Sequence, residues 1–129
     1  MPNPALPPYE LTFEERPEYL LARVTGPEDS LEVSISFWQE IAVEVQRRQT
    51  EKLMVWENFP NNVDTIDMLR VATFLTELGL ANIQVAFVDE RHEQLDRNRF
   101  GELVAINRGL RGKVFVDVQE AEAWLRGSS

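Results

Sequence analysis

The stretch Ile83-Gln84-Val85-Ala86-Phe87-Val88 decides the fold of this chain, because all but one of its residues are apolar. A strand with one face in water alternates between apolar and polar residues, whereas a strand covered on both faces is apolar almost throughout. Strands of the second kind belong mainly to parallel sheets with helices packed on both sides. This stretch therefore predicts an α/β protein with parallel strands.

The segments on either side of this strand have the spacing of amphipathic helices. The preceding helix is predicted to begin near Asp64 and to end at Gly79 in a left-handed conformation. Its inward face is predicted to consist of Ile66, Leu69, Ala72, Leu75 and Leu78. The following helix is predicted within residues 92–107. Its buried side is predicted to consist of Leu95, Phe100, Leu103, Val104 and Ile106.

The rest of the chain continues this alternation of strands and helices. A hairpin is predicted over residues 9–25, followed by a helix that starts with a capping box formed by Asp29 and Glu32. Further strands are predicted at 53–56 and 113–116, and a short helix closes the chain. Helical crossovers between strands favour parallel pairing. The predicted fold is α/β, a mixed, mostly parallel five-stranded sheet with about four helices in the order ββαβαβαβα.

Length and composition indicate a single domain. The chain has 129 residues, of which 43% are hydrophobic, and this is enough for one core. Four of the seven prolines fall within residues 1–8, which are predicted to form a flexible arm. The domain itself is predicted over residues 9–126, and the polar residues 127–129 are predicted to form a flexible tail.

The charge and the amino-acid content exclude several classes of partner and location. A formal net charge of -9 disfavours binding to nucleic acid and to anionic lipid surfaces. The chain has no cysteine, which is typical of a reducing compartment. It also lacks a secretory signal and any run of about 18 apolar residues. We therefore expect a cytoplasmic protein with no nucleic-acid partner and no integral membrane segment.

No catalytic motif is recognisable. Only His92 could serve as an imidazole base, and its charged neighbours indicate an exposed helix end. One histidine and no cysteine cannot build a zinc site, and the glycines form no phosphate-binding motif. We expect no catalytic residue, no metal site and no cofactor, and the chain is predicted to be non-enzymatic.

Acidic residues follow three of the predicted strands, at the edge of a parallel sheet where α/β proteins usually bind ligands. They are Glu57, Asp89, Glu90 and Asp117. Their oxygens could bind Mg²⁺ or Ca²⁺ or act in acid–base chemistry, so an acid- or Mg-dependent enzyme is an alternative. Acidic residues at strand exits also serve as helix caps and exposed turn residues. Both interpretations stay open.

One stretch is basic within this acidic chain, because residues 91–113 contain six basic and three acidic side chains. Arg97, Arg99, Arg108 and Arg111 are therefore candidates for a surface that meets an acidic partner or a phosphorylated ligand. A solvated helix surface gives the same pattern.

Two local features carry a family resemblance. The first is a short apolar strand followed by eight positions from Trp56 to Asp64, with Asp64-Thr65 at a helix start. The second is the closing stretch that runs from Val114 to Leu125. With the element order, these features resemble the STAS domain, whose bacterial prototype is the anti-sigma-factor antagonist. They resemble more closely the divergent SpoIIAA-like group, over about residues 9–126.

The resemblance implies a phosphoswitch. In the antagonist family an Asp-Ser pair opens the second helix and the serine is phosphorylated; Asp64 matches that aspartate and Thr65 the serine. The chain departs from the family at Trp56, which replaces an aspartate on the strand, and at Asp67, which would repel a phosphate. In the alternative interpretation, Asp64 or Thr65 only caps the helix.

The resemblance and the lack of catalytic motifs predict a non-enzymatic regulatory or interaction domain, which binds a protein partner or forms a homodimer. The alternative is a small-molecule or lipid-binding domain with an apolar pocket between sheet and helices, built from Phe74, Phe87 and Phe100. An apolar cavity would favour the ligand class, and a filled core with an exposed apolar helix face would favour the partner class.

Overall fold

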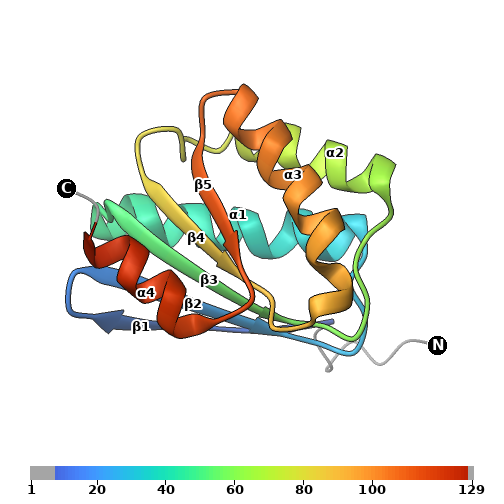
Figure 1. The fold of residues 1–129 in the computed structure, drawn as a ribbon. Helices are drawn as coiled ribbons and strands as arrows, with labels where there is room; N and C mark the ends of the chain where they lie inside the picture. Colours follow the sequence, from blue (N-terminus) through green and yellow to red (C-terminus); the bar gives the residue numbers. More distant parts are fainter. Residues whose placement is uncertain (1–7, 128–129) are drawn as a thin grey trace.

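The computed structural model describes residues 8–127, which form a five-stranded sheet with helices on both faces (Figure 1). Apart from Pro8 and Gly127, the predicted arm at 1–8 and the predicted tail at 127–129 lie outside the described residues. Gly127 is the last residue of the final helix.

The strands and helices follow one another in the predicted order. They are β1 (Glu10–Arg16), β2 (Tyr19–Thr25), α1 (Leu31–Arg48), β3 (Lys52–Asn58), α2 (Thr65–Leu75), β4 (Gln84–Val88), the 3-10 turn η1 (His92–Gln94), α3 (Leu95–Asn107), β5 (Arg111–Phe115) and α4 (Val118–Gly127). The spatial order is β1-β2-β3-β4-β5; β1 pairs with β2 antiparallel, and all other pairs are parallel. The predicted fold class, a mixed, mostly parallel five-stranded α/β sheet with four helices, is confirmed.

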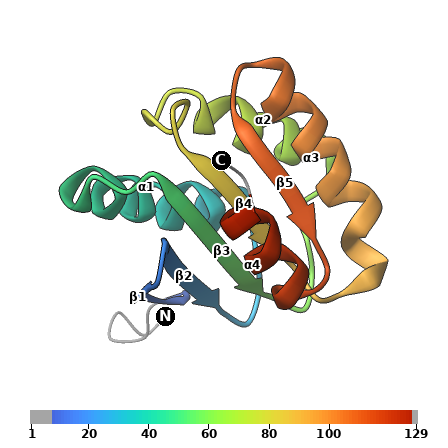
Figure 2. The ribbon, with the colours of Figure 1, turned by 60° about the vertical axis from the view of Figure 1, so that its left-hand side comes forward.

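The helices divide unevenly between the two faces of the sheet (Figures 1 and 2). Helices α1, α2 and α3 cover one face, and α4 covers the other. In β2, Leu20, Ala22 and Val24 point into the larger core beneath the three helices, while Tyr19 and Leu21 point into the smaller core beneath α4. This alternation is the period of two that a strand imposes on its side chains. No helix within residues 8–127 is long and apolar enough to cross a lipid bilayer.

The first helix begins one residue later than predicted. Ser30 is its N-cap, with a side chain that accepts the backbone N–H of Val33 at 3.1 Å. The predicted capping box of Asp29 and Glu32 is wrong, because serine at the next position satisfies the helix start and leaves Asp29 in the preceding loop. Asp29 is buried there and accepts the hydroxyl of Ser34 at 2.8 Å.

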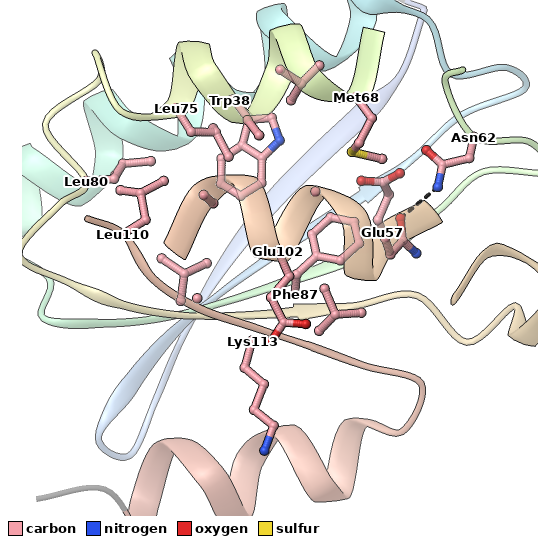
Figure 3. A pocket seen from close by; sticks show the side chains of 18 of the residues that line it. Trp38, Glu57, Asn62, Met68, Leu75, Leu80, Phe87, Glu102, Leu110 and Lys113 are labelled. Atoms are coloured by element: carbon pink, nitrogen blue, oxygen red, sulfur yellow. Dashed lines mark hydrogen bonds between the residues drawn. The ribbon is translucent and has the colours of Figure 1, made fainter. Parts of the chain in front are cut away.

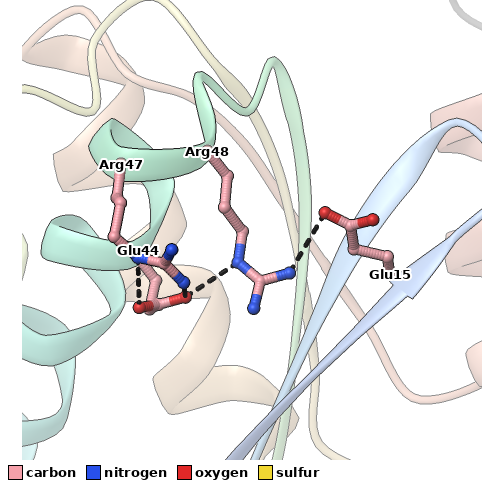
Figure 4. A network of polar contacts seen from close by, with 4 residues as sticks. All are labelled: Glu15, Glu44, Arg47 and Arg48. Carbon is pink, nitrogen blue, oxygen red and sulfur yellow. Dashed lines mark hydrogen bonds and ion pairs between the residues drawn. The ribbon is translucent and has the colours of Figure 1, made fainter.

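The C-terminal end of α1 is joined to the hairpin by a polar network on the surface (Figure 4). Arg47 and Arg48 each donate a hydrogen bond of 2.8 Å to Glu44, and Arg48 also donates to Glu15 of β1 at 3.1 Å. The hydrogen bonds from the two arginines lower the pKa of Glu44 to about 2. Because these side chains are in contact with solvent, the network adds little to stability.

The buried faces of α2 and α3 match the predicted ones only in part: Ala72 is buried, and Leu75, Leu78 and Val104 pack against the larger core, as predicted. Five side chains that were expected to point inward lie on the surface, with 36% to 63% of their area exposed: Ile66, Leu69, Phe100, Leu103 and Ile106. The residues that α2 buries are Val71 and Ala72, and those that α3 buries are Asn98, Gly101 and Ala105.

The close approach of α2 and α3 explains why these five apolar side chains face outward. A methyl group at Gly101 would lie 2.6 Å from the sulfur of Met68, so glycine lets α3 pack tightly against α2. Small and polar residues take the inner positions of α3, which turns the large apolar side chains outward. Gly79 has the expected positive φ of 77°, but α2 has already ended at Leu75.

Candidate functional site

A cavity of about 100 Å³ lies between the sheet and helices α2 and α3 (Figure 3). Most of its wall is apolar, with Met68 and Leu75 above it and Phe87 of β4 below it. Leu80 and Leu110 surround the end farthest from Met68. The structure therefore contains an unfilled apolar space beneath the two helices.

Small residues leave this space open. Gly101 and Ala105 face it from α3, Ala72 from α2 and Gly112 from β5. Protein interiors are otherwise packed as densely as organic crystals, so a space lined by such small side chains is a local departure from normal packing. It is the kind of concave, mostly apolar site that small ligands occupy.

The opposite end of the cavity is polar. Glu57 lies near the end of β3, Asp29 in the loop after β2, Asn62 in the loop after β3, and Asn98 on α3. Asn62 donates a hydrogen bond of 2.7 Å to the side-chain oxygen of Asn98 (Figure 3). The polar end thus sits at the carboxyl edge of the parallel strands, where open α/β sheets bind their ligands.

Glu57 and Asp29 form a buried carboxyl pair joined by a hydrogen bond. Burial raises the pKa of Glu57 well above its ordinary value, and the charges of Asp29 and Asp89 raise it further. Burial also raises the pKa of Asp29, but hydrogen bonds from Ser34, from the backbone of Ser30 and from Glu57 oppose that rise. Of the two carboxyls, Glu57 is therefore the one that binds a proton more readily, and a proton on Glu57 can be donated to the carboxylate of Asp29.

Asp89 lies in the same region, next to the positively charged Arg91. It accepts hydrogen bonds from the side-chain amide of Asn98 at 3.0 Å and from the backbone N–H of Arg91 at 3.1 Å. Burial raises the pKa of Asp89, and these hydrogen bonds together with the charge of Arg91 oppose the rise. The negative charge of Asp89 is thus partly offset within the protein.

The four acidic residues that the sequence singled out do not converge. Glu57 and Asp89 lie close enough for their charges to interact. Glu90 is exposed and accepts the indole N–H of Trp56 at 3.1 Å. Asp117 is exposed and accepts a backbone N–H in the first turn of α4. No group of three or more Asp, Glu or His side chains within residues 8–127 is placed to hold a metal ion.

The sequence pattern misses Asp29, the residue that pairs with Glu57. It assigns Asp29 to a helix cap, although Ser30 beside it is an equally good cap residue. A second signal was available: Asp29 follows the end of β2, and an acidic residue after a parallel strand lies at the same edge as Glu57.

Thr65 and Asp64 lie at the start of α2, outside the cavity lining. Thr65 is exposed, and Asp64 is the N-cap, which accepts the backbone N–H of Asp67 at 2.8 Å. Asp64 already accepts the backbone N–H of Asp67. A phosphate on Thr65 would therefore have to compete with the carboxylates of Asp64 and Asp67 at the start of the helix.

The four candidate arginines are all exposed but do not gather at one place. Arg97 and Arg108 are separated by about 16 Å along the helix axis, at 1.5 Å per residue. Arg97 donates a hydrogen bond of 2.9 Å to the carbonyl of Val63. Arg99 lies between them on α3, and Arg111 begins β5, at the amino edge of the sheet.

Of the three aromatic residues expected to build a pocket, only Phe87 is part of the cavity wall. Phe74 does not line it, and Phe100 is one of the exposed residues of α3.

No protein-family model and no curated protein matches the chain.

Proposed function

We propose that the chain is a non-enzymatic interaction domain of the STAS/SpoIIAA-like type, which self-associates through the outer side of α2 and α3. The observation that carries this proposal is the surface formed by Ile66, Leu69, Phe100, Leu103 and Ile106, here called the α2/α3 face. These are five of the six large hydrophobic side chains that are exposed within residues 8–127. Single exposed apolar residues are normal, but a concentration on two adjoining helices is typical of a protein interface.

The charges around this face favour a second copy of the chain as the occupant. Residues 64–78, which include α2, contain three acidic residues and one basic residue, whereas residues 91–113, which include α3, carry a net charge of +3. A two-fold axis through the face would lay α2 of one copy against α3 of the other. Opposite local charges would then meet twice, in a chain whose overall charge of -9 repels a second copy elsewhere.

The element order also supports the family assignment within this proposal, since the observed arrangement ββαβαβαβα is the one on which the STAS resemblance rests. The phosphoswitch has weaker support, because Asp64 is engaged as the cap of α2. Self-association through the α2/α3 face does not require it.

Sedimentation velocity over a concentration range from low micromolar to several hundred micromolar tests the proposal. The wild-type chain is expected to form dimers, and Leu103→Glu is expected to be monomeric because it places a charge on the α2/α3 face. Val43→Glu is the matched control, since Val43 is equally exposed but lies on α1. A wild-type chain that stays monomeric at the highest concentration, or a dimer that survives Leu103→Glu, would overturn self-association through this face.

Small-molecule binding is the second candidate function, and the cavity beneath α2 and α3 favours it. The space is enclosed by apolar side chains on one side and by a few convergent polar groups on the other. This combination is the usual composition of a ligand site. The two functions are compatible, because the cavity lies on the inner side of the helices and the α2/α3 face on their outer side.

A further inference from the structure

The polar end of the cavity holds two buried carboxyls, Glu57 and Asp29, and neither forms an ion pair with a lysine or arginine of residues 8–127. The charged and polar groups that shift the pKa values of Glu57 and Asp29 are carboxyls, a serine hydroxyl and a backbone N–H, and none of them is a lysine or an arginine. With one shared proton, the pair holds a single negative charge in a buried setting. A buried charge without a partner is costly, so this end of the cavity favours a positively charged occupant.

The cationic side chains nearest to this region are directed elsewhere. Arg91 lies beside Asp89 and donates a hydrogen bond to Asn58. Lys113 lies along the cavity wall, but its ammonium group points away from the cavity towards α4 and lies 5.5 Å from the ring centre of Phe115 (Figure 3). No lysine or arginine of the described part of the chain therefore supplies the compensating charge for Glu57 and Asp29, and an occupant of the cavity could supply it.

The size and lining of the cavity limit the rest of the occupant. An engineered apolar cavity of roughly 150 Å³ accommodates benzene, so a cavity of about 100 Å³ has room for a molecule smaller than benzene, of about four to five non-hydrogen atoms. Apolar side chains, among them Met68, Leu75 and Phe87, make up most of the lining, and they match an alkyl group. The occupant that fits both ends is short, aliphatic at one end and cationic at the other.

We propose that the cavity binds a short primary alkylamine, with its ammonium group at Glu57 and Asp29 and its alkyl group between Phe87 and Leu75. This assignment rests on the second candidate function and is independent of self-association. The ammonium group donates hydrogen bonds to the carboxyl pair, and charge-assisted bonds of this kind are about twice as strong as neutral ones. A carboxylate ligand of the same size would be repelled by the same two residues.

The test is an NMR titration of the full chain with isobutylamine, which has five non-hydrogen atoms and is cationic at neutral pH. Its matched controls are isobutanol, which is neutral, and propionate, which is anionic; both also have five non-hydrogen atoms. At constant ionic strength, isobutylamine is expected to shift the amide signals of Gly101 and Gly112 saturably, with a dissociation constant about tenfold lower than that of isobutanol. Propionate is expected to leave these signals in place.

Two variants tie the effect to the cavity. Asp29→Asn combined with Glu57→Gln keeps two hydrogen-bonding side chains but removes the negative charge of the pair, and it is expected to weaken isobutylamine binding about tenfold and leave isobutanol binding unchanged. Ala105→Leu fills the space and is expected to abolish binding of both molecules. The fold of each variant is checked by its amide spectrum before titration.

A pH series adds a readout that a purely apolar site would not show. An ammonium group stabilises the ionised form of Glu57, so isobutylamine should bind more tightly as pH rises, while isobutanol should not. The charged groups that face Glu57 are Asp29 and Asp89, with Arg91 beside Asp89. Ionisation of Asp29 would strengthen amine binding in the same direction, so the pH series is repeated on Glu57→Gln, whose smaller pH dependence identifies the share that belongs to Glu57.

The outcomes separate the two levels of the proposal. Equal binding of isobutylamine and isobutanol would overturn the amine assignment and leave a small-molecule site in place. No saturable shift with any of the three molecules at tens of millimolar would overturn both the amine assignment and the second candidate function.

Discussion

Replacing Glu57 with glutamine should remove a large part of the pH dependence of stability near neutral pH. In the folded chain, burial and two neighbouring carboxylates raise the pKa of Glu57 well above 4.5, the value that applies when the chain is unfolded. Between these two pKa values, the folded state binds one proton more than the unfolded state. The free energy of unfolding must therefore fall as pH rises through this range. Glutamine cannot titrate, but its amide can still donate to Asp29.

The size of the effect follows from the single proton. A difference of one bound proton changes the free energy of unfolding by about 1.4 kcal/mol per pH unit. Each pH unit that lies between the unfolded and the folded pKa of Glu57 should therefore cost the wild-type chain about 1.4 kcal/mol, compared with the 5 to 15 kcal/mol typical of a domain. Below pH 4.5 the carboxyl is protonated in both states, so its contribution is constant and fully present there.

Urea unfolding between about pH 5 and pH 8, followed by the fluorescence of buried Trp38, measures this difference. The stability of Glu57→Gln relative to wild type should increase by about 1.4 kcal/mol per pH unit until the folded pKa of Glu57 is reached. Glu51→Gln is the matched control, because Glu51 lies exposed just before the same strand. The titration of Asp89 occurs in all three proteins and cancels to first order, whereas that of Asp29 is coupled to Glu57 and changes in Glu57→Gln. If the wild-type and Glu57→Gln stabilities change with pH in parallel, Glu57 does not hold a proton in the folded state.

Three further changes should alter stability for separate reasons, each measurable by urea unfolding at neutral pH. Gly26→Ala should destabilise by about 2 kcal/mol, since its methyl group would lie 2.6 Å from an aromatic carbon and 2.8 Å from a backbone oxygen; an unchanged midpoint would show that this contact relaxes freely. Ser30→Ala should cost about 1 kcal/mol by removing the acceptor for Val33 at the start of α1, and Ser30→Asp should restore it. Asn98→Ala should cost about 2 kcal/mol because it deprives buried Asp89 of a donor. If Asn98→Ala lowers the free energy of unfolding no more than the same change at an exposed asparagine, a water molecule replaces the side-chain amide as the donor to Asp89.

The fold could be predicted from the sequence because strand burial leaves a direct trace in the residues. The run at residues 83–88 is apolar since α4 covers one of its faces and the larger helical layer covers the other. The capping residue Asp64 was likewise readable, because a helix start needs a short acceptor side chain at one position. These are local requirements, and each can be recognised within a few residues.

The orientation of α2 and α3 could not be predicted in the same way. Apolar spacing identifies a helix, but it indicates the buried side only when the large residues are the ones that face the core. Here Gly101 and Asn98 face inward because of what they meet: Met68 on the neighbouring helix, and Asp89 after the neighbouring strand. Both partners are distant in the sequence. The pairing of Asp29 with Glu57 has the same cause, since 28 positions separate two residues that only the parallel register of β2 and β3 brings together.

The reversal of α3 links the two proposals physically. If Phe100, Leu103 and Ile106 faced the sheet, they would fill the cavity and leave a polar surface outside. Because they face outward, the same helix leaves an unfilled space beneath it and an apolar face above it. Exposed apolar area is unfavourable in water, so this arrangement would be stabilised by anything that covers the face or fills the space. An occupant of the cavity supports α3 from below and a second copy supports it from above, and each should therefore favour the other through the helix that they share.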